Sequence, residues 1–260
     1  DNKKSIIFNQ SSVSGHAELA WIFNCIARVG WLNRMTQFKD KAGNDKEKAS
    51  VGLYIYPNLM AADILLYKAT HVPVGADQKQ HLELCRDIAQ KFNSDFKKKI
   101  FPIPEPLIQK KIARVMSLRD GTKKMSKSDE SDYSRINLKD SADDIIKKIK
   151  KAKSDTFSIP DNLKDLEKKP EASNLINIYS DLSEMSLEQV LNEVNGKDYS
   201  FLKKKLSEAL IEVICPIGKK IKSLLEDKRY LEKILNEGTE KARDIAVYNL
   251  KEIRNVIGFL

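Results

Sequence analysis

A short run of lysine and serine residues has side chains suited to phosphate chemistry. Residues 124–128 read Lys-Met-Ser-Lys-Ser, and Gly121 lies just upstream. Lysine ammonium groups are compact charges with three hydrogen-bond donors, and serine hydroxyls are short donors that leave room for a ligand. Such a loop can stabilise the charge that builds on a leaving pyrophosphate. The pentamer alone leaves open the alternative of a solvated basic loop.

Alternating strands and helices are expected to position this loop. The pattern predicts a buried strand at 6–8 and then a helix over 15–29, begun by Ser14. A second helix is expected to open at Tyr56-Pro57, followed by a β-like segment at 71–75. A third helix, begun by Asp77, and a strand at 113–118 complete the alternation. Three prolines within 101–106 argue against a regular element there. This alternation favours a parallel α/β sheet with right-handed crossovers.

The second half of the chain has helical patterns only. Ser141 and the acidic residues after it form a helix-start signal. Later helices are expected at 172–182, 186–194, 199–226 with a bend near Pro216, and 229–257. A change of structural class is therefore expected near residue 136.

Composition predicts a folded globular protein in a reducing setting. The 260 residues are 41% hydrophobic and 32% charged, which does not suit a disordered chain. No apolar run is long enough to span a membrane. Three widely spaced cysteines form no disulfide framework, which favours a cytoplasmic location. The cysteines do not have metal-ligand spacing, and the same is true of His16, His71 and His81. No protein-bound metal is therefore expected, and the histidines are interpreted as structural.

The positive charge is concentrated in the first half. Residues 1–130 carry 22 Lys and Arg against 14 Asp and Glu, which accounts for +8 of the net charge of +9. A basic region attracts the phosphates of a nucleotide or a nucleic acid. Lysines number 37 and arginines only 9, a bias that genome composition also produces. Charge alone therefore does not decide between these interpretations.

Longer segments carry a resemblance to a known family. The pentamer 124–128 is identical to the second motif of class I aminoacyl-tRNA synthetases. Residues 56–67 resemble the amino-acid-binding segment of bacterial tryptophanyl-tRNA synthetases, and 72–81 resemble a segment of that family that contacts nucleotide and amino acid. Matches at 34–39 and 174–179 extend the resemblance over nearly the whole chain.

The resemblance implies roles in binding tryptophan. Asp63 would accept the indole N–H, which only donates, although a helix-surface carboxylate is the alternative. Met60, Val72 and Val74 would line the indole. Tyr56 and Gln78 would contact the backbone groups of the amino acid. For Met60, Val72 and Val74, ordinary packing in the hydrophobic core is nearly as good an interpretation.

The resemblance also implies an ATP site. The ribose would lie against Gly75, Ala76 and Asp77, and the adenine would meet the main chain of Val115. The family often has an acidic residue at position 76, so Ala76 departs from it. The phosphates would be bound by Lys41, whose register an insertion leaves open, and by Lys124, Met125, Ser126, Lys127 and Ser128. Lys124 and Lys127 would be the catalytic charges, and Mg²⁺ would accompany ATP.

The implied activity is ATP-dependent charging of tRNA(Trp) with tryptophan. Residues 1–135 would be the remainder of a Rossmann-like catalytic domain, and 136–260 a helical anticodon-binding domain whose last helix returns toward the first domain. The partners implied are L-tryptophan, ATP and tRNA rather than DNA. The family also implies a homodimer, with the helix over 15–29, including Trp21 and Phe23, as an interface element.

One motif of the family is missing from this sequence. Class I synthetases carry a first motif after their first strand, which positions ATP phosphates on a helix N-terminus. No such stretch precedes the matched segments, so we expect an N-terminally truncated synthetase, and the sequence leaves open whether this chain is active without that segment. Three rival interpretations are a tyrosyl enzyme of the same fold, a non-catalytic remnant that binds RNA or a protein, and a nucleotidyltransferase of related fold.

Overall fold

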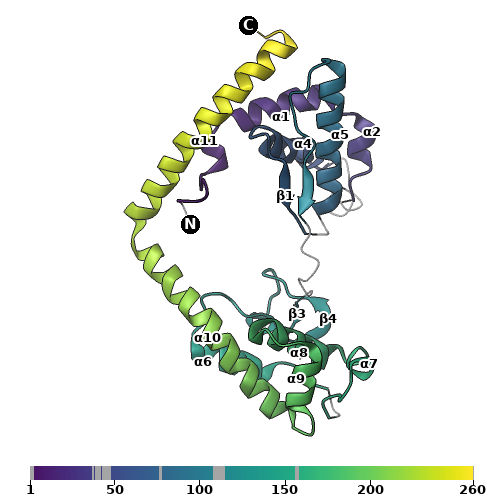
Figure 1. Cartoon of the computed structure of the whole chain (residues 1–260), viewed down its shortest axis with the longest axis vertical. Helices are drawn as coiled ribbons and strands as arrows, with labels where there is room; N and C mark the ends of the chain where they lie inside the picture. Colours follow the sequence, from purple (N-terminus) through teal and green to yellow (C-terminus); the bar gives the residue numbers. More distant parts are fainter. Residues whose placement is uncertain are drawn as a thin grey trace. The chain divides into compact units, whose positions relative to one another are not determined.

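The chain folds into two compact units. The structure, a computed structural model, describes residues 3–36, 38, 42, 48–75, 78–107, 115–155 and 158–259. One unit comprises Asp1–Lys110 with Arg229–Leu260, and the other comprises Lys111–Lys228 (Figure 1). These units divide the chain differently from the expected boundary at residue 135. The pentamer Lys124–Ser128, hereafter the clamp pentamer, lies in the second unit, and the last helix lies in the first unit.

A parallel pair of strands supports the first unit. Strands β1 (His71–Pro73) and β2 (Glu105–Leu107) are joined by helix α5 (Lys79–Asp95). This arrangement confirms the predicted parallel α/β connection. The expectation of no regular element over 101–106 was wrong at β2, where Pro106 lies opposite Val72. Proline has no N–H to donate, and it is tolerated here because the pair has only edge strands among the described residues.

The first unit has four helices before β1 whose limits the structure describes, and one of them begins earlier than its proline suggests. They are η1 (Gln10–Ser12), α1 (Gly15–Ile26), α2 (Val29–Asn33) and α4 (Val51–Leu65). The prediction that Pro57 opens a helix was wrong, because α4 begins at Val51 and Pro57 lies inside it. The side chain of Ser50 accepts a hydrogen bond from the Leu53 N–H and so caps the true start.

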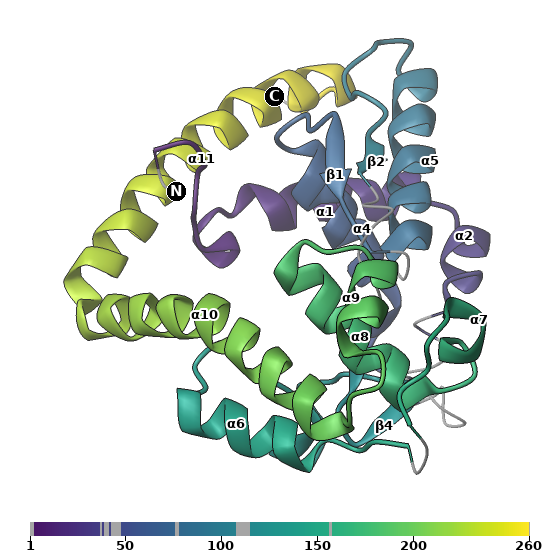
Figure 2. The ribbon, with the colours of Figure 1, turned by 60° about the horizontal axis from the view of Figure 1, so that its bottom comes forward.

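Three helices enclose the core of this unit. Helices α1 and α5 both pack on α4 (Figure 2). The predicted apolar face of α5 is fully confirmed, with at most 1% of each side chain exposed at Leu82, Cys85, Ile88, Ala89 and Phe92. Phe23 is completely buried, with its ring 5.5 Å from that of Phe101, so the prediction that it faces a partner was wrong. Trp21 on the same helix is 67% exposed.

The last helix, α11 (Lys228–Ile257), packs against the start of the chain, as the sequence predicted. Asn249 donates to the Leu66 carbonyl at 2.8 Å, and Arg254 pairs with Glu18. The strand expected at 6–8 is absent: these residues form no regular element, and Ile6 and Ile7 are about half exposed. This segment crosses α11 at Gly238, where a Cβ atom would overlap the Ile7 carbonyl oxygen.

The second unit is a helical bundle with a small hairpin. Strands β3 (Met116–Ser117) and β4 (Asp120–Lys124) are antiparallel and lie on helix α8 (Figure 2). The remaining elements are η4 (Asp132–Ser134), α6 (Ala142–Lys151), α7 (Leu163–Leu166), α8 (Pro170–Ser183), α9 (Leu187–Val194) and α10 (Tyr199–Glu226). The limits of α8, α9 and α10 were predicted to within about two residues, and so was the start of α6; η4 and the short α7 were not predicted.

Local capping explains why these helices were predictable. Ser141 with Asp144 and Ser186 with Gln189 form reciprocal capping boxes at the starts of α6 and α9. The core beneath them is built from buried Ile, Leu and Val side chains of α6, α8, α9 and α10. Within the described residues, no helix combines the length and apolarity that crossing a membrane requires.

Candidate functional site

The expected site residues divide between the two units. Those expected to bind the amino acid lie on α4 and around β1, and those expected to bind phosphates lie on and after β4. Three of the expected ATP-binding residues, Lys41, Ala76 and Asp77, fall outside the described residues.

Asp63 lies on α4 with one of its two oxygens already bonded. Its Oδ1 accepts hydrogen bonds from Gln10 Nε2 and His16 Nδ1, each at 2.7 Å. Its Oδ2 accepts none from the part of the chain that the structure describes. The Asp63 side chain is 36% exposed. Asp63 is therefore a fixed carboxylate with one free acceptor atom that a ligand can reach.

His16 connects Asp63 to a third polar group. The His16 side chain is 5% exposed, and its Nε2 lies 2.8 Å from the Tyr67 hydroxyl. In the tautomer with a proton on Nδ1, His16 donates to Asp63 and accepts from Tyr67. Burial, and then the negative charge of Asp63, raise the pKa of Tyr67 to about 12. The ring of Phe8 packs on both His16 and Tyr67.

Two further residues expected in the amino-acid site share a face of α4 with Asp63. Tyr56, Met60 and Asp63 are spaced four and three residues apart, which places them on one side of the helix. The Tyr56 hydroxyl lies 2.8 Å from His81 Nε2, and burial raises the pKa of Tyr56. Met60 is partly buried against the core.

The residues around β1 are less enclosed. Val72 and Val74 are partly buried against the same core, in keeping with both the pocket and the core interpretations. Gly75 is exposed, and its carbonyl accepts from the Gln78 N–H at 3.0 Å. Gln78 is half-buried directly before α5.

The clamp pentamer begins on a strand rather than in a loop. Lys124 is the last residue of β4, and the Met125 N–H donates to the Val115 carbonyl at 3.1 Å. Within the described part of the chain, Ser126 and Ser128 bond only to each other, with their hydroxyls 2.9 Å apart. Lys124 and Lys127 are exposed, and neither forms an ion pair with a described residue. Both ammonium groups are thus available to an anionic ligand.

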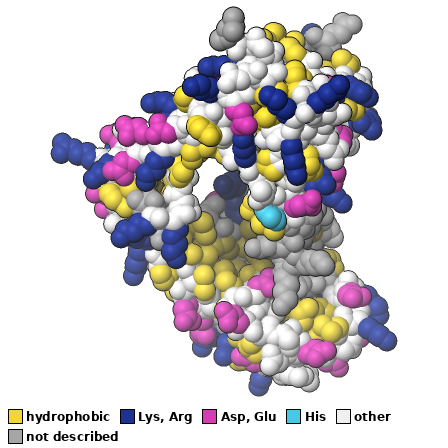
Figure 3. Space-filling model, turned by 45° about the horizontal axis from the view of Figure 1, so that its top comes forward, with side chains coloured by type: hydrophobic (Ala, Val, Ile, Leu, Met, Phe, Trp, Pro, Cys, Tyr) yellow, Lys and Arg dark blue, Asp and Glu magenta, His cyan; other side chains and the backbone are white. Residues whose placement is uncertain are grey.

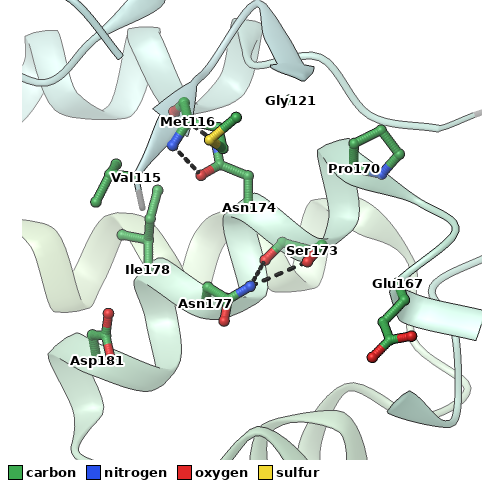
Figure 4. A pocket seen from close by; sticks show the side chains of 10 residues that line it. All are labelled: Val115, Met116, Gly121, Glu167, Pro170, Ser173, Asn174, Asn177, Ile178 and Asp181. Carbon is green, nitrogen blue, oxygen red and sulfur yellow. Dashed lines mark hydrogen bonds between the residues drawn. The ribbon is translucent and has the colours of Figure 1, made fainter. Parts of the chain in front are cut away.

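The hairpin that carries the pentamer is attached to α8. The amide of Asn174 accepts from the Met116 N–H at 2.9 Å and donates to the Met116 carbonyl at 2.8 Å (Figure 4). A Cβ atom on Gly121 would lie only 2.5 Å from the Pro170 carbonyl carbon, so the two backbones are in direct contact. A pocket of about 260 Å³ lies alongside, lined by Val115, Met116, Gly121 and the polar face of α8.

The chain that leaves the pentamer is fixed by a buried ammonium group. Lys148 of α6 is 5% exposed and lies 2.6 Å from Asp132 Oδ2 and 2.7 Å from Asp140 Oδ2. Burial lowers the pKa of Lys148, but its hydrogen bonds to the two carboxylates outweigh this, and the net pKa is raised. Hydrogen bonding to Lys148 lowers the pKa of Asp132. Both ends of the clamp segment are therefore held by helices of the second unit.

The charged surface is mixed on the face that can be seen. Lys and Arg side chains are interspersed there with Asp and Glu rather than gathered into one patch (Figure 3). Groups of three or more His, Cys, Asp or Glu able to hold a metal ion were sought among the described residues, and none was found.

Sequence reasoning missed three residues that organise these sites. Gln10 and His16 orient Asp63, yet His16 was read only as structural, and Gln10 has no signal of its own. Asn174 lies in a segment that resembles the family, but its contact with Met116 joins residues 58 positions apart. Spacing along the chain could not have revealed either contact.

Comparison with known proteins identifies the family. Residues 1–214 match the class I tRNA synthetases of the W and Y type. The chain therefore belongs to this family of class I synthetases, with the Rossmann-like α/β fold that the sequence predicted.

The similar curated proteins are named for one amino acid. The tryptophan–tRNA ligase of Caulobacter vibrioides is 56% identical over the whole of this chain and 76% of its own length. That of Mesorhizobium japonicum is 54% identical, again over the whole chain and 79% of the relative.

Solved structures of tryptophanyl-tRNA synthetases also superpose on this chain. The tryptophanyl-tRNA synthetase of Mycoplasma pneumoniae superposes with a TM-score of 0.83 at 33% identity, covering 99% of this chain and 78% of that one. The enzyme from Campylobacter jejuni, in complex with ADP and tryptophan, gives 0.80 at 33% identity over the same shares of the two chains. A tyrosyl-tRNA synthetase from Aeropyrum pernix shares only the fold, at 22% identity and a TM-score of 0.59.

The coupling of Tyr67 to Asp63 predicts a specific alkaline titration. The phenol should ionise near pH 12, so its contribution to stability is complete below about pH 10 and is lost as pH rises toward 12. Asp63→Asn should lower the pKa of Tyr67 while leaving it above 10, because burial remains. Difference absorbance between each background and its Tyr67→Phe variant isolates this tyrosine. An unchanged Tyr67 titration in Asp63→Asn would contradict the coupling.

Proposed function

We propose that the protein activates L-tryptophan with ATP and transfers it to tRNA(Trp). The observation that carries the proposal is Asp63, which Gln10 and His16 hold with one oxygen free. The indole nitrogen can only donate, and a fixed acceptor-only oxygen is its chemical complement. The identity of 52–56% to tryptophan–tRNA ligases over the whole chain supports the same substrate.

The amino-acid-binding residues would act by positioning. In the first step the tryptophan carboxylate attacks the α-phosphorus of ATP, and pyrophosphate leaves. We assign Asp63 to the indole N–H, and Met60, Val72 and Val74 to its apolar surface. Tyr56 and Gln78 would hold the backbone groups of the amino acid, so that the carboxylate is oriented for attack. No general base is assigned, since orientation and electrostatics can carry the step.

The clamp pentamer would stabilise the triphosphate. Lys124 and Lys127 are exposed and have no carboxylate partner among the described residues, so their charge is available to the leaving pyrophosphate. Ser126 and Ser128 add short donors. On the family resemblance alone we assign Gly75, Ala76 and Asp77 to the ribose, the main chain of Val115 to the adenine, and Met125 and Lys41 to the phosphates. Mg²⁺ would arrive bound to the oxygens of ATP.

The second step passes the aminoacyl group to a ribose hydroxyl at the end of the tRNA. We infer that the helices after residue 136 contact the anticodon part of that tRNA. A cytoplasmic location fits this activity and the free thiols at Cys25, Cys85 and Cys215.

The test of the function is pyrophosphate exchange into ATP, measured with tryptophan and with tyrosine in parallel. Exchange that depends on tryptophan alone is the expected result. Exchange with tyrosine alone would establish the rival tyrosyl specificity. Exchange with neither amino acid, from a folded protein, would favour a binding protein without activity.

Removing one clamp charge should affect chemistry more than binding. We expect Lys127→Ala to lower the rate of tryptophan activation roughly 100-fold, because its ammonium acts on charge that develops in the transition state. The dissociation constant for tryptophan should change less than about threefold. Lys123→Ala is the matched control, since Lys123 is a neighbouring exposed lysine that pairs with Asp120. Equal losses in rate and affinity would refute the transition-state role.

Asp63 should select for the indole N–H. We expect the wild-type protein to prefer tryptophan over its benzothienyl analogue, which lacks that donor, by roughly 100-fold. Asp63→Ala should reduce this preference nearly to unity. Asp95→Ala, which removes an exposed carboxylate paired with Lys91 on α5, is the control. Normal discrimination in Asp63→Ala would exclude the assigned contact.

We also propose a homodimer, with the exposed side of α1 as part of the interface. Trp21 is 67% exposed, and Val29 and Val51 on neighbouring elements are 66% and 72% exposed. Contiguous exposed apolar patches mark interaction surfaces, and a partner that covered Trp21 would remove a large apolar side chain from water. Light scattering should give twice the chain mass, and Trp21→Glu should shift the protein toward the monomer. A monomer mass for the wild type would contradict the proposal.

A further inference from the structure

Asn174 holds the backbone of the strand that leads into the clamp pentamer. Its side chain is 95% buried on α8, and both ends of its amide are used. Oδ1 accepts from the Met116 N–H at 2.9 Å, and Nδ2 donates to the carbonyls of Met116 at 2.8 Å and Ser117 at 3.4 Å. An amide that bonds both polar groups of one residue fixes the position and the direction of that strand.

The strand held by Asn174 is paired directly with the clamp. Met116 is the partner of Lys124 across the hairpin, and the Met125 N–H donates to the carbonyl of Val115. The first lysine of the pentamer is therefore paired directly with the residue to which Asn174 is hydrogen-bonded. Figure 4 shows the amide of Asn174 directed from α8 toward Met116.

Close contact at Gly121 fixes the hairpin at a second point. A Cβ atom there would lie 2.5 Å from the Pro170 carbonyl carbon and 2.7 Å from the Glu171 nitrogen. Only a glycine lets the backbone of β4 lie this close to the first turn of α8. Two contacts on different residues prevent the hairpin from sliding or turning on the helix.

The clamp has few contacts of its own that could replace these. Ser126 and Ser128 bond within the pentamer, and the two lysine side chains are exposed. We propose that Asn174 is a positioning residue for the reaction: by fixing Met116 on α8, it sets where the ammonium groups of Lys124 and Lys127 stand. This inference rests on the proposed function for its catalytic consequence, while the anchoring itself is independent of it.

The test compares four substitutions at three positions. Asn174→Asp keeps the size and the acceptor but removes the donor to Met116 and Ser117, and Asn174→Ala removes both. Asn177→Ala is the matched control, because Asn177 lines the same pocket one turn along α8 but, among the residues that the structure describes, its side chain bonds only to Ser173 of its own helix (Figure 4). Gly121→Ala disturbs the second contact point without touching the amide.

Two measurements separate anchoring from catalysis. Hydrogen exchange over residues 115–128 reports on the anchor, and pyrophosphate exchange gives kcat with the KM for ATP and for tryptophan. We expect both Asn174 variants and Gly121→Ala to exchange faster over 115–128. Their kcat/KM for ATP should fall roughly 10- to 100-fold, since small displacements of a reacting group cost this much, while the KM for tryptophan stays within about twofold. Asn177→Ala should match the wild type in both.

Each outcome decides one part of the inference. Unchanged hydrogen exchange in folded Asn174→Ala would overturn the anchor. Faster exchange with kcat/KM for ATP unchanged, or with equal losses for ATP and tryptophan, would overturn the positioning role. If the wild type lacks tryptophan-dependent exchange altogether, the proposed function fails and the positioning role with it, but hydrogen exchange still decides the anchor. Thermal unfolding of every variant confirms that it is folded.

Discussion

A two-stranded sheet buries too little surface to be stable alone, and both sheets among the described residues have only two strands. Each two-stranded sheet must therefore be held in position by the helices that pack against it. The parallel pair β1–β2 is joined by α5, whose apolar face is completely enclosed. The hairpin β3–β4 has no such crossover and lies on α8 through Asn174 and Gly121. The positions of the functional groups at the ends of these strands thus depend on the helices that support the strands.

Paired polar groups provide this positioning. Asp63 is oriented by Gln10 and His16, Met116 by Asn174, and the exit from the pentamer by Lys148 between two carboxylates. A buried group left without its partner costs about 1–3 kcal/mol, and more when it is charged. Pairs of this kind specify one geometry more strictly than apolar packing, which tolerates repacking. The polar contacts therefore lie where orientation matters, and apolar packing fills the rest.

The helices of the second unit could be predicted from the sequence because their signals are local. Capping residues such as Ser141 and Ser186 and apolar periodicity mark their limits within a few positions. Prediction was wrong where tertiary contacts override local preference: Ile6 and Ile7 form no strand where their segment crosses α11 at Gly238, and Pro57 is accommodated inside α4. In the site, the chemical types at Asp63 and Lys124–Ser128 could be recognised. Their supports could not, because Gln10 to Asp63 and Asn174 to Met116 span more than fifty residues.

The return of α11 to the first unit has a consequence for how the protein is made. Contacts from Asn249 to Leu66 and from Arg254 to Glu18 join residues 183 and 236 positions apart, whereas the second unit is one continuous stretch. A ribosome adding roughly 5–20 residues per second needs on the order of 10 s to make the intervening unit. During that time the apolar surface that α11 will cover stays open to water. The contiguous unit can thus fold during synthesis, while the discontinuous one must wait for its final helix.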